Sequence, residues 1–74
     1  MTTRPTIDLR GIACPLSWAK ARVMLETFTR GDEVELLVDD PRGARDIPRA
    51  AEATGHHVAG VIATGGCWRI TIEV

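Results

Sequence analysis

Residues 58–74, with the sequence VAGVIATGGCWRITIEV, contain two β-prone runs that flank Gly65 and Gly66. Two adjacent glycines can adopt the positive φ angles that a tight hairpin turn requires. In the second run, residues 68–74, apolar side chains alternate with polar ones, which is typical of a strand with one buried and one solvated face. The chain is therefore predicted to end in an antiparallel hairpin that packs on a core with one face only.

Two stretches closer to the N-terminus are also predicted to be strands. Residues 33–39 alternate cleanly, with Val34, Leu36 and Val38 on the side that is expected to be buried. Residues 6–9 form a shorter β-prone run. The sequence thus contains four candidate strands.

The segment between these two strands predicts a helix from Pro15 to about Thr29. It contains no glycine and no further proline, and proline suits the first helical position because its missing N–H would be unpaired there. Cys14 is then expected at the N-cap, and Gly31 at a left-handed C-cap. The side of the helix that is expected to face the core comprises Trp18, Ala21, Met24, Leu25 and Phe28.

A second helix is predicted after residues 39–43, where aspartate, proline and glycine are typical of a turn. Asp46 is expected to cap this helix, because a carboxylate can accept the unpaired N–H groups of a first turn. Pro48 would then lie in the first turn, where proline is tolerated, and the helix would end near Gly55.

The predicted element order is β-α-β-α-β-β. Two right-handed crossovers that step in the same direction place both helices on the same face of the sheet. The sequence therefore predicts an α/β (α+β) two-layer sandwich, with a four-stranded mixed sheet and both helices on one face. Residues 1–74 are expected to form a single domain, although the order of the strands does not follow from the sequence.

Composition excludes several classes of function. The 74 residues carry a formal net charge of −1, with 26% charged residues of both signs, so no positive field favours nucleic acid. RNA binding through the solvated sheet face is the least favoured alternative. No apolar run is long enough to span a membrane, and the first residues lack a secretory pattern. A cytoplasmic protein without direct nucleic-acid or membrane binding is expected.

The two cysteines, Cys14 and Cys67, are far apart in the sequence and match neither a disulfide framework nor a zinc pattern. His56 and His57 are adjacent and follow a predicted helix end, where capping of terminal carbonyls is their expected role. No metal site is expected. Cys67 is interpreted as structural or incidental, because nothing near it in the sequence is expected to activate it.

Cys14 is the residue whose position in the sequence most clearly predicts chemical reactivity. A sulfur at a helix N-terminus meets unpaired N–H groups and the positive end of the helix dipole, which favour the thiolate. Arg10 could supply a further cation from the entry loop. The thiolate is the nucleophilic form of cysteine. The alternative, a buried cysteine that acts as a small hydrophobic residue, remains open at this point.

Several motifs are shared with one known family. They are Leu9-Arg10-Gly11-Ile12-Ala13-Cys14-Pro15, Gly31-Asp32, Asp39-Asp40-Pro41 and Arg45-Asp46-Ile47-Pro48. In this combination and at these separations the sequence resembles the TusA/SirA family of small sulfur carriers, over nearly the whole chain. The resemblance implies the β-α-β-α-β-β sandwich reached above.

The resemblance also implies a function. Cys14 would accept sulfane sulfur as a persulfide from a donor, such as a cysteine desulfurase or a rhodanese-type enzyme, and pass it to an acceptor protein. No bound cofactor is implied, and a monomer is expected. Whether such a sulfurtransferase-type carrier counts as an enzyme stays open, as does its pathway, since the family serves transfer RNA thiolation, molybdenum cofactor assembly and sulfur oxidation.

The sequence departs from the family motif Cys-Pro-x-Pro, because it has Ser17 at the second proline position. With Cys14 at the N-cap, Ser17 would be the third helical residue, whose N–H is a natural partner for an N-cap side chain. Cys14, Arg10, Pro15 and Ser17 are therefore the predicted sulfur environment. The alternative is a regulatory or interaction module of the same fold that has lost sulfur transfer.

Two further groups of residues are candidates with a simple structural alternative. Leu16, Ala19 and Val23 form a second apolar stripe on the first predicted helix, which suits a docking surface or merely scattered surface residues. Asp39 and Asp40, followed by Pro41, could orient a partner, but a role in capping and turning the chain is favoured.

Overall fold

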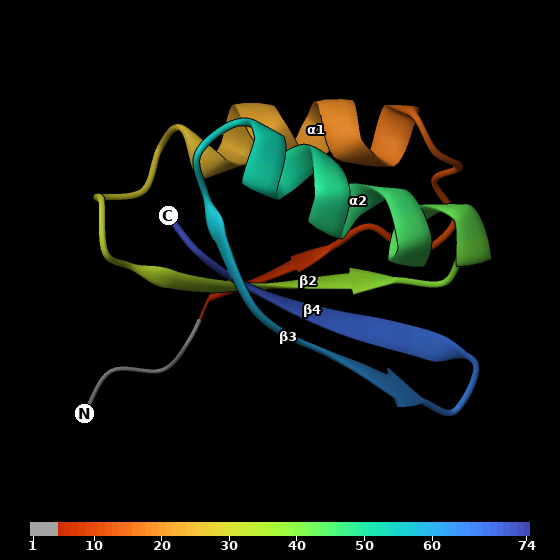
Figure 1. Ribbon diagram of the computed structural model, residues 1–74. Helices are drawn as coiled ribbons and strands as arrows, with labels where there is room; N and C mark the ends of the chain where they lie inside the picture. The colour runs from red at the N-terminus through yellow and green to blue at the C-terminus, as the bar shows by residue number, and fades with distance from the viewer. Residues whose placement is uncertain (1–4) are drawn as a thin grey trace.

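Four strands form one mixed sheet in a computed structural model of the protein that describes residues 5–74 (Figure 1). The elements in chain order are β1 (Thr6–Asp8), α1 (Leu16–Leu25), β2 (Glu33–Val38), α2 (Pro41–Ala53), β3 (His57–Thr64) and β4 (Cys67–Glu73). The strand order is β1-β2-β4-β3. β1 and β2 are parallel, and β4 is antiparallel to both β2 and β3.

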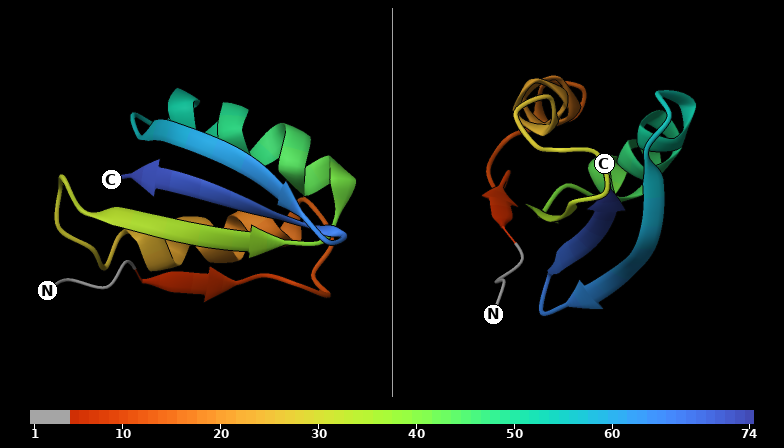
Figure 2. Two further views of the ribbon diagram at one scale, coloured as in Figure 1. Left: turned by 90° about the horizontal axis from the view of Figure 1, so that it is seen from below. Right: turned by 90° about the vertical axis from the view of Figure 1, so that its left-hand side faces the viewer.

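Both helices cover the same face of this sheet, and the opposite face is open, as Figure 2 shows from below and end-on. The predicted two-layer sandwich is therefore confirmed. The terminal hairpin is also confirmed, because Gly65 and Gly66 have φ angles of 55° and 86° and Thr64 pairs with Cys67.

The core lies between the helix layer and the sheet. Its buried hydrophobic residues are Ile7, Leu9, Ala21, Leu25, Val34, Leu36, Val38, Ile47, Ala51, Ile70 and Ile72. Trp18, Phe28 and Trp68 are half-buried against this cluster. The alternation that predicted β2 and β4 thus placed their inward residues correctly, because side chains on successive strand residues point to opposite faces.

The prediction for α1 is wrong at both ends. The helix begins at Leu16 with Pro15 as its N-cap, so Cys14 lies one position before the cap, and the Cys14–Pro15 peptide bond is cis. The helix ends at Leu25, where the N–H of Thr27 and the hydroxyl of Thr27 both donate to the carbonyl of Met24. Such local hydrogen bonds compete with continuation of the helix.

Two details of the predicted inner side of α1 also differ. Met24 is 37% exposed, and the buried residues of the helix are Ser17, Ala21 and Leu25. Gly31 has a φ of 97°, as expected for a glycine in the left-handed region. It lies in the turn before β2, however, where its N–H donates to the carbonyl of Val74 at 2.7 Å.

The predicted start of α2 is wrong by several residues. Asp40 is the N-cap, Pro41 is the first helical residue, and Asp46 lies inside the helix. Asp40 and Pro41 together provide an acceptor for the first turn and a residue without an N–H, which is a strong helix start. Gly43 suggested a turn in the sequence, but it is buried in the first turn of α2.

No helix within residues 5–74 is long and apolar enough to cross a membrane.

Candidate functional site at the Cys14 loop

The chain between Leu9 and Pro15 connects β1 to α1 at the edge of the sheet where α2 also begins (Figure 1). Cys14 lies at the end of this loop, with a free thiol that is half-buried. The residue is therefore partly exposed to solvent. The open alternative of a fully buried cysteine therefore does not hold.

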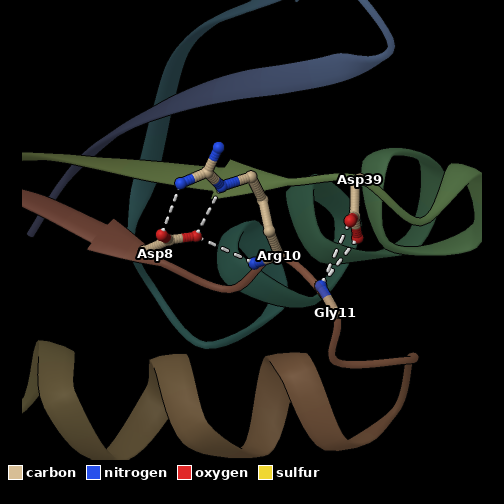
Figure 3. Close-up of polar contacts among 4 residues, drawn as sticks. All are labelled: Asp8, Arg10, Gly11 and Asp39. Carbon is tan, nitrogen blue, oxygen red and sulfur yellow. Dashed lines mark hydrogen bonds and ion pairs between the residues drawn. The ribbon is translucent and has the colours of Figure 1, made fainter.

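The two aspartates that follow β2 hold this loop. The carboxylate of Asp39 accepts the N–H of Gly11 with both oxygens, at 3.0 and 3.2 Å (Figure 3). The carboxylate of Asp40 accepts the N–H of Cys14 at 2.9 Å and the N–H of Arg42 at 3.0 Å. Their interpretation as structural residues is thus supported by contacts that link the Cys14 loop to the start of α2.

The hydrogen bonds to Asp40 also stabilise its charged form. They lower the pKa of the Asp40 carboxyl, with the N–H of Cys14 as the largest cause and the N–H of Arg42 as the second. A carboxylate that accepts two backbone N–H groups is favoured over the protonated acid, which has less acceptor capacity. Asp40 is therefore an ionised acceptor that holds the backbone of Cys14.

The predicted hydrogen bond from the Ser17 N–H to the Cys14 sulfur is not formed. Ser17 is the second helical residue, and its N–H donates to the carbonyl of Ala13 at 3.1 Å. The prediction failed because it placed the start of the helix one residue too early. In the first turn, the N–H groups of Leu16 and Trp18 have no acceptor among residues 5–74, so they remain available to an anion at this end of α1.

The side chain of Ser17 has a different position from the one that the sequence suggested. Ser17 is 1% exposed, and its hydroxyl is buried without a hydrogen-bond partner in the part of the chain that the structure describes. A Cβ atom at Gly43 would lie 3.7 Å from this oxygen. Ser17 therefore lies at the contact between α1 and α2.

The structure does not bring Arg10 to Cys14. The guanidinium of Arg10 pairs with the carboxylate of Asp8, with N–O distances of 3.0 and 2.8 Å, and Figure 3 shows it pointing away from α1. This pair lowers the pKa of Asp8 to about 2, because the charged carboxylate accepts the Arg10 side chain and its backbone N–H. The guanidinium of Arg10 is thus held by Asp8 on the open side of the sheet.

Arg45 is the cation that the sequence analysis missed near Cys14. The pKa of its guanidinium is raised, chiefly by a hydrogen bond to Asp46 at 3.1 Å and to a smaller extent by the Cys14 sulfur. Arg45 is exposed and belongs to α2. The motif that contains Arg45 was interpreted as a helix start, and no signal in the local sequence showed that the fold brings it near Cys14.

Cys67 lies at the start of β4, and its thiol is also free and half-buried. Cys67 makes a small contribution to the raised pKa of the Arg10 guanidinium, whose main cause is the hydrogen bond to Asp8. The backbone N–H of His56 donates to the carbonyl of Ala51 after the end of α2. Within residues 5–74, no three histidine, cysteine, aspartate or glutamate side chains form a group that could hold a metal ion.

The second apolar stripe of α1 is solvent-exposed. Leu16 is 68% exposed and Val23 is 64% exposed, and Ala19 between them is exposed as well. The position of these side chains agrees with the expectation that they point away from the core. Their exposure leaves these side chains free to contact another molecule.

Comparison with known proteins identifies the family. The family model described as "Sulfurtransferase TusA" matches residues 5–74, which is all of the described chain. The chain belongs to the TusA family. The members of this sulfur-carrier family work between sulfur donors and sulfur acceptors.

Relatives of this TusA-family protein agree with the assignment. A protein of Archaeoglobus fulgidus that is named as a sulfur carrier is 32% identical over 68 residues, covering 90% of this chain and 77% of its own length. A protein of Thermotoga maritima with the same name is 30% identical over 70 residues, which cover 93% of this chain and 89% of that protein. The crystal structure of a SirA-like protein from Desulfitobacterium hafniense superposes with a TM-score of 0.79 and 25% identity, covering 93% of this chain and 95% of that one.

Proposed function

We propose that this TusA-family protein accepts sulfane sulfur as a persulfide on Cys14 and passes it to an acceptor protein. The observation that carries the proposal is the half-buried, free Cys14 thiol at a loop that two aspartates fix to the start of α2. Fixing the backbone on both sides of the loop positions the sulfur, and half-burial leaves it reachable.

The proposed chemistry needs no bound cofactor. The Cys14 thiolate attacks the outer sulfur of a persulfide on the donor, and the donor's S–S bond breaks. The donor cysteine leaves as a thiolate with the electron pair of that bond, and a new S–S bond forms on Cys14. An acceptor thiolate then repeats this step on the outer sulfur of the Cys14 persulfide, so sulfur moves without net oxidation or reduction.

The neighbours of Cys14 suit a bound persulfide, which is an anion at neutral pH. The N–H groups of Leu16 and Trp18 lack acceptors among residues 5–74, and the positive end of α1 favours negative charge. Arg45 adds a positive charge from α2. The proposed donor is a cysteine desulfurase or a rhodanese-type enzyme, because both present sulfane sulfur on a cysteine.

Persulfide transfer through this protein tests the proposal. The protein is incubated with a cysteine desulfurase and cysteine, separated from the donor, and then mixed with a reduced acceptor thiol while its intact mass is recorded. The unmodified protein is expected to gain about 32 Da, one sulfur atom, and to lose it to the acceptor. Cys67→Ser should behave in the same way, and Cys14→Ser should gain no sulfur.

The same experiment tests the alternative of a regulatory module without sulfur transfer. An unmodified Cys14, under conditions that load another TusA-family carrier, would contradict the proposal and favour that module. Loading of the Cys14→Ser variant would contradict it in a different way, because it would assign the sulfur to Cys67.

A further inference from the structure

The helix layer presents a line of arginines to solvent. Arg42, Arg45 and Arg49 follow one another on α2 at spacings of three and four residues, and all three are exposed. Residues at these spacings lie on one side of a helix. The buried residues of α2 are Gly43, Ile47 and Ala51, which lie on the opposite side.

The neighbouring helix presents an apolar line with the same spacing. Leu16, Ala19 and Val23 are exposed on α1, opposite its buried residues. α1 and α2 lie side by side on the sheet and both run from the same end, as Figures 1 and 2 show. An apolar line and a basic line therefore run next to each other over the outer surface of the helix layer.

The first residue of each line, Leu16 and Arg42, lies near the Cys14 loop. Leu16 is two residues beyond Cys14 in the sequence. Arg42 donates its N–H to Asp40, whose carboxylate also holds the N–H of Cys14. A partner that approaches the sulfur from the outside of the helix layer would meet the two lines together.

The positive charge of this surface is only partly neutralised. Arg45 pairs with its neighbour Asp46 at 3.1 Å, and their side chains are 67% and 46% exposed, so solvent weakens the pair. Arg42 and Arg49 form no ion pair within residues 5–74. The protein as a whole has a net charge of −1, so this line of three arginines is more positive than the molecule on average.

We propose that these six residues, three on each helix, form a docking surface for a partner protein that carries carboxylates and apolar side chains around its own reactive cysteine. This inference rests on the proposed function, because it names the chemistry of the donor or acceptor surface that faces Cys14. Complementary charge orients the two proteins as they approach and raises their association rate. Apolar contacts lengthen the lifetime of the complex.

Other occupants fit this surface less well. A nucleic acid would satisfy the arginines, but its phosphates would leave Leu16, Ala19 and Val23 without apolar contacts. A second copy of the chain would have to offer carboxylates. On the open side of the sheet, Asp8 and Glu35 are already paired with Arg10 and Arg69, at 2.8 and 2.7 Å.

Exchange with two designed peptides tests the proposal. Each peptide is an amphipathic helix with leucines on one side and a terminal cysteine held as a mixed disulfide with thionitrobenzoate. One peptide carries glutamates on its other side, and the second carries lysines. The protein is Cys67→Ser, so that only Cys14 can attack the peptide sulfur and release the coloured thionitrobenzoate thiolate.

The glutamate peptide is expected to react about tenfold faster than the lysine peptide at low ionic strength, and the ratio should fall as salt is added. Arg42→Gln combined with Arg49→Gln should reduce the ratio to about two. The matched control, Arg22→Gln combined with Arg30→Gln, changes the net charge equally but lies outside the surface, and it should leave most of the preference intact.

Equal rates for the two peptides would overturn the proposal, and so would an equal loss of preference in the control variant. Retention of transfer RNA at moderate salt, lost on substitution of Arg42 and Arg49, would assign the surface to nucleic acid instead. The peptide ratio does not depend on persulfide formation. Failure of sulfur loading with an intact ratio would therefore remove the carrier function and keep the docking surface.

Discussion

Asp40 connects the chemistry of Cys14 to the fold at the scale of single residues. One of its oxygens accepts the N–H of Cys14, and the other accepts the N–H of Arg42 at the start of α2. Asp39 performs the corresponding task for Gly11. Since these contacts join segments that are distant in the sequence, the position of the sulfur depends on the end of β2 as well as on its own loop.

Asp40→Asn is expected to release the backbone of Cys14. An asparagine can still cap α2, but it has a single acceptor oxygen and cannot accept both N–H groups with separate oxygens. The amide hydrogen of Cys14 should exchange with solvent about tenfold faster in this variant, as measured by residue-resolved hydrogen exchange.

Asp39→Asn is the matched control for this prediction. It should increase the exchange of the Gly11 amide and leave that of Cys14 nearly unchanged, because the two carboxylates hold different N–H groups. Unchanged protection of the Cys14 amide in Asp40→Asn would show that Asp40 does not hold the loop.

At the scale of elements, the contact between α1 and α2 sets the geometry around the site. Ser17 of α1 and Gly43 of α2 are both buried at this contact. The absence of a side chain at Gly43 leaves room for the Ser17 hydroxyl, which has no hydrogen-bond partner in residues 5–74. A buried hydroxyl without a partner costs free energy.

Ser17→Ala is therefore expected to increase the free energy of unfolding by about 1 kcal/mol, because it removes an unpaired buried polar atom and also favours the helix. Gly43→Val should lower it by about 1–3 kcal/mol, because a branched side chain would crowd Ile47 and Ser17. Urea unfolding of the two variants measures both effects. A large loss of stability in Ser17→Ala would mean that the hydroxyl has a partner in solution.

For the whole molecule, the sheet separates two different environments. The helix face holds the core, with Cys14 at its rim, and the open face carries ion pairs between Asp8 and Arg10 and between Glu35 and Arg69. Asp8 has a pKa lowered to about 2 by Arg10, and the pKa of Asp40 is lowered by the N–H groups of Cys14 and Arg42. Both carboxylates favour the folded state only while they are ionised.

The stability of the protein is expected to fall between about pH 4 and pH 2. A carboxyl whose pKa is lower in the folded state contributes stability above its ordinary pKa, near 4, and loses that contribution as the pH falls toward the folded value. Thermal unfolding of the double variant Asp8→Asn and Asp40→Asn should show a shallower dependence on pH in this range.

Glu52→Gln is the control for the pH measurement. The side chain of Glu52 is exposed and forms no hydrogen bond or ion pair within residues 5–74, so its substitution should leave the slope unchanged. A double variant with the slope of the unmodified protein would contradict the roles assigned to Asp8 and Asp40.

The strands and the two-layer arrangement could be predicted because their signals are local. The alternation in β2 and β4 and the two glycines of the hairpin depend only on neighbouring residues. The order of the strands could not be predicted, since it depends on pairings between distant segments.

Glycine and proline gave wrong predictions of turns and helix starts where the residue is placed by tertiary contacts. Gly43 suggested a turn but provides space between two helices. Pro15 was expected as the first helical residue but is the N-cap, which displaced Cys14 and Ser17 by one position each. Cys14 is a free, half-buried cysteine, and its role in sulfur transfer stays a prediction. The cation near it, Arg45, comes from α2, so the sequence around Cys14 gives no sign of it.

The central claim is that the transferred sulfur resides on Cys14. Peptide mapping of the wild-type protein after sulfur loading tests this claim most directly. Trypsin cleaves after lysine and arginine, so Cys14 is recovered in residues 11–20 and Cys67 in residues 50–69. After loading by a cysteine desulfurase and alkylation, the additional sulfur is expected on the first peptide alone and should disappear from it when an acceptor thiol is added. An additional sulfur on residues 50–69, or on neither peptide, would contradict the account.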